Sequence, residues 1–559
     1  MLLSNGGAGQ PAPPASVKRS DLLARLAADR LWDMVVIGGG ATGLGVALDA
    51  ALRGFSVALV DADDFAKGTS SRATKLVHGG VRYLAQGDIG LVWEALHERA
   101  TLLANAPHLA QPLPFIMPSY RWWEKWFYGA GLVIYDMLAG KAGLSNTEFL
   151  SRSATLRCSP TARAAGLYGG VKYWDGQFDD ARLAIALART AVAQGACAVN
   201  HCTATGLIAA GGAIEGVAVR DNETGREIAL RSRCVINAAG VWVDAIRRMD
   251  NPQARDIVAP SQGVHVVVER AFLPTDHALL IPKTEDGRVL FAVPWLGRTI
   301  LGTTDTPRHD LPLEPVPFED EIDFILREAG KCLSRGPTRA DIRSVWVGLR
   351  PLVKPDAGGD TENTKRLSRE HTVLVSKRGL VTVTGGKWTT YRAMAEDVLT
   401  RCFERGLLPE RRSGSTNHHK LAGAPAQGDG GEKSLGRPVP LSAPPGLHLY
   451  GSDAALVRSL PGADHDLCPG LSEAMVRFAA RYEFARTVED VLARRSRLLF
   501  LDARLASSLA DPVAAILSEE LGPSFDAPAS ARAFAALATR YAAPVFERNQ
   551  DAPARASTA

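Results

Sequence analysis

The chain has 559 residues, 46% of them hydrophobic, which is enough apolar material for two or more domains. Lys and Arg number 64 against 60 for Asp and Glu, and a net charge of +4 on so long a chain predicts no nucleic-acid partner. Seven cysteines without a C-x-x-C pair argue against zinc or a disulfide framework and predict buried thiols in a reducing compartment.

The first residues, MLLSNGGAGQPAPPAS, are rich in Gly, Pro and Ala. They lack the positive start and continuous apolar run that an export signal needs. We therefore expect residues 1–30 to form a flexible tail of a cytoplasmic chain.

Residues 32–61 read as strand, glycine turn, Ala-rich helix and second strand, the opening of a βαβ unit. Gly38, Gly40 and Gly43 fit G-x-G-x-x-G at the turn. The first glycine permits the tight bend, the second lets the backbone approach a pyrophosphate, and the third lets the helix pack closely on the strand. The helix N-terminus then offers free N–H groups to the phosphates. Asp61 ends the second strand, where a carboxylate can accept hydrogen bonds from a ribose. The pattern predicts a dinucleotide site but does not separate NAD from FAD.

The next segment, TSSRATKLVHGGVRYL at residues 69–84, is too polar for core. Its hydroxyls and Lys75 can hold pyrophosphate or ribityl oxygens, and its glycine pair lets backbone approach a flat ring. A solvated loop is the alternative. The cofactor-binding residues predicted here are Thr69, Ser70, Ser71, Lys75, His78 and Gly79.

Trp122 to Leu138, WWEKWFYGAGLVIYDML, mixes aromatic residues with charges. Such a composition suits a bilayer interface, and a buried helix of the core fits equally well. Nowhere do about 18 uncharged apolar residues follow one another, so we expect no membrane-spanning helix.

Further strand-like runs occur at 234–244, 265–268 and 380–384. They predict an α/β fold in which a discontinuous Rossmann-like dinucleotide-binding domain is interleaved with a mixed or antiparallel-sheet substrate domain, together over residues 31–410. A Gly/Pro/Ser-rich linker at 411–446, a C-terminal helical domain at 447–548 and a flexible tail at 549–559 complete the expected organisation.

Several ordered motifs give the chain a family resemblance. TSSRATK with HGGVRYL, GVHVVV around His265, PWLGRTILGTTDT from Pro294, GLRPL around Arg350 and GGKWTTYR from Gly385 all resemble the FAD-dependent glycerol-3-phosphate dehydrogenases. The likeness runs from about Asp33 to Arg392. It implies FAD as cofactor, oxidation of glycerol 3-phosphate to dihydroxyacetone phosphate, and electron transfer to a membrane quinone or, in oxidase relatives, to oxygen.

A buried phosphate dianion needs fixed cations, because an unpaired buried charge is costly. Arg82, Arg350, Lys387 and Arg392 are the candidates, arginine having the planar fork that suits phosphate. The resemblance assigns Arg82, Tyr83, His265, Arg350 and Lys387 to the substrate pocket. It also places Gly385, Gly386, Lys387 and Thr389 against the flavin, where a helix N-terminus would stabilise reduced flavin.

Alcohol oxidation requires a base within reach of the hydroxyl while a hydride passes to flavin N5. His265 is preferred because its ordinary pKa lies near neutrality. Lys387 is an alternative base, and His78 could contact the flavin. Arg350 is expected to stabilise the negative charge of the alkoxide. We expect no metal, since neither a His/Glu cluster nor a calcium loop is present.

The expected location is the inner face of the cytoplasmic membrane, with the lipid surface and a membrane quinone as partners beside glycerol 3-phosphate. The sequence leaves a homodimer open. Rival hypotheses are a glycerol-3-phosphate oxidase, an amino-acid or amine flavin oxidase, and a non-catalytic flavoprotein.

Overall fold

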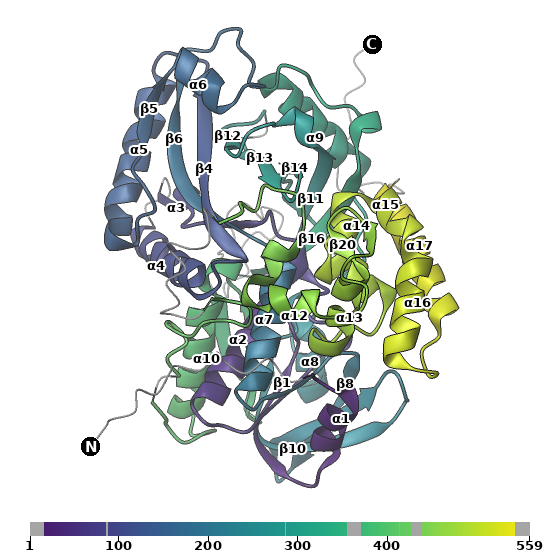
Figure 1. Ribbon diagram of the computed structural model, residues 1–559. Helices are drawn as coiled ribbons and strands as arrows, with labels where there is room; N and C mark the ends of the chain where they lie inside the picture. Colours follow the sequence, from purple (N-terminus) through teal and green to yellow (C-terminus); the bar gives the residue numbers. More distant parts are fainter. Residues whose placement is uncertain are drawn as a thin grey trace, which may run out of the picture.

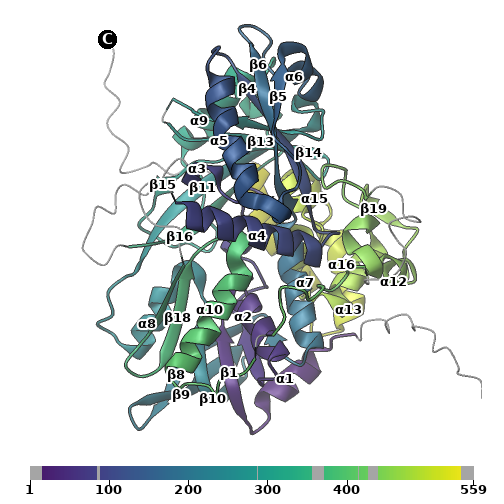
Figure 2. The same cartoon turned by 90° about the vertical axis from the view of Figure 1, so that its left-hand side faces the viewer.

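The computed structural model describes residues 16–84, 88–285, 287–354, 371–412, 414–425 and 438–542, without the side chains of Arg82 and Tyr83. Two sheets form two stacked lobes, and C-terminal helices lie along one side of both (Figure 1). Figure 2 shows α4 crossing between the two lobes at their junction. The expected fold class, an interleaved α/β chain with a helical C-terminal domain, is confirmed.

The first sheet is the Rossmann-like one, and its central strands are parallel. It gathers segments far apart in the chain, so the nucleotide domain is discontinuous as predicted. Its central strands are apolar on both faces, as parallel strands covered by helices must be. In spatial order the strands are β17 (His371–Val375), β18 (Leu380–Gly385), β10 (Glu227–Asn237), β1 (Leu31–Ile37), β2 (Val57–Val60) and β7 (Cys197–Val199), with β9 (Ala213–Asp221) on β10 and β8 (Cys202–Ala210) on β9.

The second sheet is mixed: most of its pairs are antiparallel, and β12 runs parallel to β4. Helix α9 packs on one part of it and α5 on another. Its strands are, in order, β15 (Thr306–Pro307), β11 (Val258–Glu269), β14 (Arg298–Gly302), β13 (Leu290–Trp295), β12 (Ala278–Ile281), β4 (Ala110–Ser119), β6 (Gly169–Phe178) and β3 (Leu76–Val77), with β16 (Ser344–Val353) on β11 and β5 (Glu148–Ser151) on β6.

Helices cover both sheets. Among them, α2 packs against both α7 and α10. The α-helices that precede the C-terminal region are α1 (Arg19–Ala27), α2 (Ala41–Leu52), α3 (Val81–Leu84), α4 (Ile89–Asn105), α5 (Glu124–Ala139), α6 (Arg152–Cys158), α7 (Asp180–Ala193), α8 (Val243–Asp250), α9 (Glu319–Cys332) and α10 (Tyr391–Glu404).

The C-terminal helices share one apolar cluster with residues of the second sheet, among them Trp295 and Trp346. Buried ion pairs attach them to the first lobe: Arg182 meets Glu483 at 2.8 Å, and Arg494 and Arg495 both bind Asp64. The elements are α12 (Ala454–Arg458), β19 (Asp466–Cys468), β20 (Leu471–Ser472), α13 (Glu473–Tyr482), a π-helical turn (Asp490–Arg495), α14 (Leu498–Leu501), α15 (Ala503–Ser508), α16 (Ala510–Leu521) and α17 (Ala527–Ala542).

The expected tail over residues 1–30 differs from the structure where the structure describes it. Residues 19–27 form α1, because Leu22 and Leu26, one helical turn apart, are both buried against the first lobe. Arg19 anchors the helix by binding Asp221 and Glu223. Within the expected linker, Leu421 and Leu441 are buried. The domain boundaries stay predictions, and residues 549–559 lie outside the described residues.

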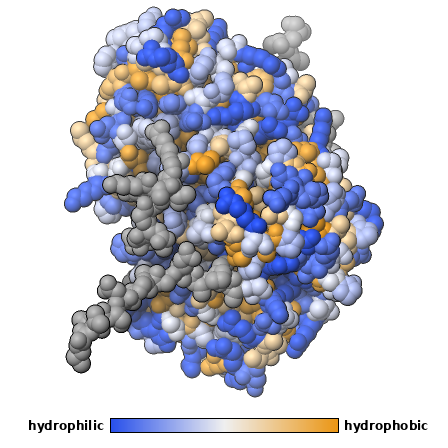
Figure 3. All heavy atoms as spheres, in the orientation of Figure 1, coloured by the Kyte–Doolittle hydropathy of each residue, from blue (hydrophilic) through white to orange (hydrophobic). Residues whose placement is uncertain are grey.

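Helix α5 carries most of the aromatic segment that the sequence singled out. One face is buried through residues such as Leu132 and Tyr135, whereas Trp122, Trp126 and Phe127 beside and within the helix are 71%, 59% and 67% exposed. Figure 3 shows hydrophobic side chains at the surface in the region of α5 and β5, on the upper left. None of the described helices is both long and apolar enough to cross a bilayer.

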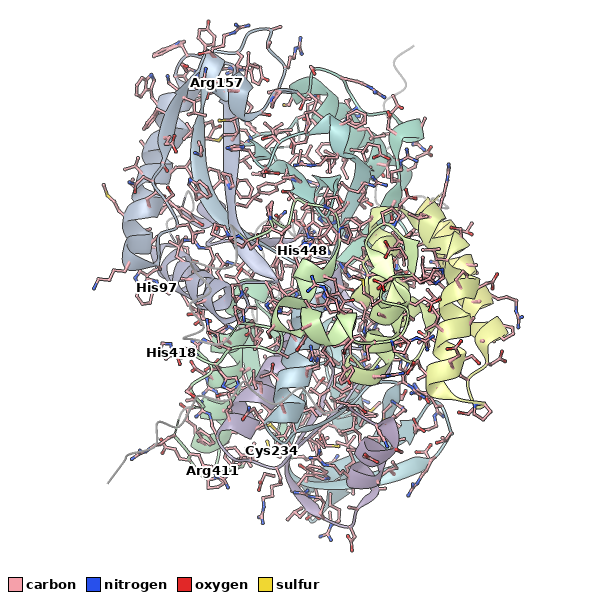
Figure 4. The ribbon with its side chains drawn as sticks, in the orientation of Figure 1. His97, Arg157, Cys234, Arg411, His418 and His448 are labelled. Atoms are coloured by element: carbon pink, nitrogen blue, oxygen red, sulfur yellow. The ribbon has the colours of Figure 1, made fainter. Side chains whose placement is uncertain are left out.

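All seven cysteines are free thiols, and five of them are buried. The Sγ atoms of Cys234 on β10 and Cys402 on α10 lie 3.7 Å apart inside the first lobe (Figure 4 labels Cys234). The predicted buried thiols are thus confirmed for these five.

Candidate active site

A cavity of about 1400 Å³ runs between the two sheets. Its walls come from the β1–α2 turn, the segment after β2, the ends of β10 and β18, strands β11 and β16, and helix α5. The ends of parallel strands and the second sheet therefore enclose one common space, where α/β proteins bind their ligands.

The glycine turn forms one end of this cavity. Gly38 has φ +111°, and a Cβ there would lie 2.5 Å from the carbonyl oxygen of Ala238. A Cβ on Gly43 would lie 1.9 Å from the Gly38 carbonyl, so this glycine permits close packing of α2 on the turn and does not itself line the cavity. Gly38 and Gly40 do line it. The bare backbone and the start of α2 fit a dinucleotide pyrophosphate.

Asp61 sits at the end of β2 beside this turn. Its carboxylate accepts hydrogen bonds from the backbone N–H of Gly39 at 2.6 Å and of Asp63 at 2.9 Å, and it faces the cavity. Burial raises the pKa of Asp61 to about 6, although these hydrogen bonds oppose the rise. Near neutral pH the carboxylate is ionised and can accept hydrogen bonds from the ribose hydroxyls of a dinucleotide. The glycine turn and Asp61 together, called the cradle below, fit the ADP half of FAD.

The polar segment that follows lines the cavity with most of its residues between Thr69 and Thr74. Thr69 and Ser70 line the cavity, and the Ser70 hydroxyl accepts a hydrogen bond from the Ala41 N–H at 3.0 Å. Ser71 does not line it. Lys75 does not either: its ammonium is fully buried and binds Asp180 of α7 at 2.7 Å. The predicted cofactor contact of Lys75 is therefore corrected, because a carboxylate from a distant helix draws the side chain away.

The glycine pair in HGG is likewise divided. His78 and Gly80 line the cavity. Gly79 lies behind them and donates its N–H to the Tyr135 hydroxyl at 2.8 Å, with no room for a Cβ between Tyr135 and Leu96. The backbone of Gly79 thus comes close to side chains of α5 and α4 and not to a ligand in the cavity. Gly80 is the glycine of the pair that lines the cavity.

The end of β18 closes the opposite wall. Gly385 and Gly386 have φ values of +82° and +73°, and with Lys387 and Thr389 they line the cavity just before α10. The Trp388 indole donates to the Ser70 carbonyl at 2.9 Å and ties this turn to the first one.

Arg392 lies outside the cavity wall. Its guanidinium binds Glu98 of α4 and Glu396 of α10, each with one contact at 2.5 Å. The substrate contact predicted for Arg392 is therefore corrected: this cation is neutralised by two carboxylates. The side chains of Arg82 and Tyr83, also predicted in the pocket, lie outside the described residues.

His265 lies on β11, fully buried in the cavity wall. Its Nε2 is 2.9 Å from the Thr74 hydroxyl, and its ring stacks on Trp346 of β16, its cross-strand partner, with ring centres 5.2 Å apart. Burial, then Lys75, then Arg350, hold the pKa of His265 well below its usual value. The imidazole is therefore uncharged at neutral pH.

Arg350 lies on β16 opposite Ser261 of β11. Its guanidinium donates to the Asp305 carboxylate at 3.1 Å, the Thr304 carbonyl at 3.0 Å and the Thr303 hydroxyl at 3.2 Å. A Cβ on Gly263 would lie 2.3 Å from Arg350 Nη2, so a side chain at this position would displace the guanidinium. The strand pair thus brings His265 and Arg350 into one cavity.

Sequence reasoning missed several cavity residues. Thr74, Thr303, Asp305 and Arg288 line the wall. Three of them sit inside the quoted motifs TSSRATK and LGTTDT, so motif membership was an available signal for these. Arg288, outside every motif, carried no such signal.

One His/Asp cluster among the described residues has metal-like spacing: Asp64, His201 and Asp490. Arg494 donates to both carboxylates and Arg495 binds Asp64. These cations complete an ion-pair network that joins the C-terminal helices to the first lobe.

Comparisons with known proteins agree on one family. Residues 33–392 match the family described as FAD dependent oxidoreductase, and residues 415–526 match the C-terminal domain of alpha-glycerophosphate oxidase. A probable mitochondrial glycerol-3-phosphate dehydrogenase of Caenorhabditis elegans is 41% identical over 91% of this chain and 73% of its own length. The mitochondrial glycerol-3-phosphate dehydrogenase SDP6 of Arabidopsis thaliana is 40% identical over 91% of this chain and 86% of its own.

Among solved structures, the glycerol-3-phosphate dehydrogenase of Bacillus halodurans complexed with FAD superposes with a TM-score of 0.76 at 28% identity, covering 95% of this chain and 99% of that one. Sequence, domain order and fold thus agree over nearly the whole length. The chain belongs to the family of FAD-dependent glycerol-3-phosphate dehydrogenases.

Proposed function

We propose that this protein oxidises sn-glycerol 3-phosphate to dihydroxyacetone phosphate with FAD as cofactor. One observation carries the proposal: the glycine cradle with Asp61 and the pair His265 and Arg350 line the same cavity. A dinucleotide and a small anionic alcohol can therefore be held side by side. The names of the relatives supply the substrate.

The cations of the cavity bind the phosphate group. Arg350 offers a guanidinium fork to phosphate oxygens, and Lys387 adds a second positive charge. Arg82 is retained as a third from the sequence prediction. Asp305 offsets part of the Arg350 charge, and so fixes its orientation in the absence of substrate.

His265 is the proposed base. Because its imidazole is uncharged, it can accept the proton of the substrate hydroxyl, and the bound phosphate then compensates the imidazolium that forms. Thr74 holds the ring through its 2.9 Å contact with Nε2. Arg350 stabilises negative charge that develops on the substrate oxygen, and Lys387 stays the alternative base.

When bound, FAD would supply the hydride acceptor, at flavin N5. The turn Gly385–Gly386 and the helical turn that follows it, with Lys387 and Thr389, would provide positive potential next to that cofactor.

For the electron acceptor we propose a membrane quinone. Part of the cavity wall, its apolar section, is formed by Phe115, Met117, Leu132, Phe127 and Ile134, the last two on the exposed side of α5. The exposed aromatics around α5 would rest in a lipid surface, at the inner face of the cytoplasmic membrane, with the apolar section opening toward it. A homodimer stays a prediction from the sequence.

The alternatives make different predictions. An oxidase would pass electrons from reduced flavin to oxygen, an amino-acid or amine oxidase would respond to those substrates, and a non-catalytic flavoprotein would keep oxidised flavin in the presence of glycerol 3-phosphate.

The test is an anaerobic titration of the purified yellow holoprotein. Glycerol 3-phosphate should bleach the flavin band near 450 nm (a general flavin property), whereas glycerol and glycine should not. Persistence of the band would refute the proposal. Adding a short-chain quinone or oxygen to the reduced protein then identifies the acceptor by the faster reoxidation.

A further inference from the structure

We propose that Lys75 is a positioning residue for the oxidation: its buried ammonium group, next to the indole of Trp346, keeps the His265 imidazole in place for accepting the substrate proton. This rests on the proposed function, in which His265 is the base. Lys75 lies behind the cavity wall. Its proposed role therefore involves no contact with cofactor or substrate.

The position of Lys75 is fixed from several sides. Its Nζ donates to Asp180 at 2.7 Å and to the Ser71 carbonyl at 2.8 Å, and its side chain is fully buried. The Asp180 carboxylate also binds Arg497, 3.0 Å away, from the C-terminal helices. The ammonium is thus held by α7, by its own loop and by the C-terminal region together.

The backbone conformation of Lys75 puts its side chain and that of Thr74 on opposite sides of the cavity wall. Lys75 has φ +65°, a left-handed conformation that non-glycine residues rarely adopt. Its neighbour Thr74 faces the cavity and contacts His265 Nε2, while Lys75 lies buried behind. Such a conformation at a lysine persists where the surroundings enforce it, as the contacts of the ammonium with Asp180 and with the Ser71 carbonyl do here.

Aromatic rings connect the ammonium to the imidazole. Lys75 Nζ lies 5.2 Å from the Trp346 ring centre and 5.3 Å from that of Trp295, and the His265 ring centre lies 5.2 Å from the same Trp346 ring, nearly parallel to it. An ammonium over an aromatic face is stabilised by the ring. Trp346 is therefore a common neighbour that contacts both Lys75 and His265.

The described charges that act on His265 work in one direction. Within the part of the chain that the structure describes, these are Lys75 and Arg350, both cations, and Asp305 faces Arg350. The other titratable groups on the cavity wall include Arg72, His78, Asp175, Arg288 and Lys387. Burial, and after it these two cations, lower the pKa of His265, so that loss of the Lys75 charge removes one of its causes. Burial also lowers the pKa of Lys75 to about 7, against the opposing effect of Asp180.

The experiment follows anaerobic flavin reduction by glycerol 3-phosphate as a function of pH, on full-length holoprotein. Lys75→Met and Lys75→Gln remove the charge, Gln keeping hydrogen-bonding capacity for Asp180 and Ser71. In both, the midpoint of the acidic limb should move up by about one pH unit, so that the rate measured at the wild-type midpoint falls roughly fivefold relative to the rate at pH 8. KM should change little, and Lys75→Arg should keep the wild-type midpoint.

The matched control is Arg182→Met. It also removes a buried cation of the same region, paired with Glu483 at 2.8 Å, yet Arg182 is not among the charges that act on His265. Its midpoint should equal that of the wild type. An unshifted midpoint in Lys75→Gln with full flavin content overturns the inference while leaving the proposed function intact. Loss of flavin in both uncharged variants, with Lys75→Arg normal, assigns Lys75 to folding alone and also overturns it. If the wild type is not reduced by glycerol 3-phosphate, both proposals fall.

Discussion

The Thr74 hydroxyl lies 2.9 Å from Nε2 of His265, and the two residues come from segments 191 positions apart in the chain. The contact orients the imidazole at the cavity wall. Replacing Thr74 by valine keeps the shape and removes the hydrogen bond, which is worth about 1 kcal/mol. We expect kcat for glycerol 3-phosphate to fall roughly fivefold, with flavin content unchanged in the absorbance spectrum. Thr74→Ser should restore the rate; a normal rate in Thr74→Val would contradict this role of the hydroxyl.

Arg350→Met should weaken substrate binding, because the substrate phosphate then loses a charge-assisted partner and Asp305 is left without its ion pair. Removal of one partner from such a pair costs about 2–5 kcal/mol, so kcat/KM should drop by roughly 30-fold or more. Steady-state kinetics with an artificial acceptor measure it.

Arg392→Met is the control for that change. Arg392 is neutralised by Glu98 and Glu396 outside the cavity, so KM should stay as in the wild type even if the melting temperature falls. Equal rises of KM in the two variants would place Arg392 at the substrate after all.

Gly38→Ala should abolish FAD retention. The new Cβ would lie 2.5 Å from the Ala238 carbonyl at a φ of +111°, and the strained backbone alone costs about 1–3 kcal/mol. The flavin-to-protein absorbance ratio after gel filtration reports the loss. Gly90→Ala on α4 is the control, because a Cβ there meets nothing within 4 Å and alanine favours the helix by about 1 kcal/mol. Full flavin in Gly38→Ala would be incompatible with the proposed cradle.

His201 should make stability depend on pH. Burial alone lowers its pKa, but the Asp490 carboxylate at 3.0 Å outweighs burial, and the net pKa lies above 6.5. A raised folded pKa gives stability that is present in full below the unfolded pKa and is lost as the pH rises through the folded pKa. Between pH 6 and 8.5, the wild type should lose more unfolding free energy than His201→Gln.

Urea unfolding at the two pH values measures this difference. His465→Gln serves as the control, since the His465 side chain is 68% exposed although it also pairs with a carboxylate, that of Glu473. The same pH dependence in His201→Gln and wild type would show that the His201–Asp490 pair does not contribute.

The double variant Trp122→Ser, Trp126→Ser should lose affinity for lipid. These indoles are 71% and 59% exposed, and neither lines the cavity, so flavin reduction in solution should stay unchanged. Co-sedimentation with anionic vesicles should fall several-fold, because indole rings favour the bilayer interface. Met249→Ser, an exposed apolar side chain on α8, is the control. Unchanged sedimentation of the double variant would remove α5 as the docking surface.

The sequence by itself determined the family, and it predicted the cofactor cradle. The structure has Gly38 and Gly43 at a turn of the predicted kind because the demands of that turn are local: a positive φ or a close backbone contact excludes every side chain at the glycines, whatever the rest of the chain does. The interleaved fold also followed from local apolar runs, because strands that are buried on both faces must be covered by helices.

Only the tertiary structure decided which polar side chains face the cavity. Lys75 and Arg392 stand in the same motifs as true wall residues, but Asp180 on α7 and Glu98 on α4 bind them elsewhere. His265 and Arg350 meet at the cavity because β11 pairs with β16, and the hydroxyl of Thr74 arrives from a third segment. A buried cation goes to the carboxylate that compensates it, and the position of that carboxylate is set by long-range packing, which no local pattern encodes.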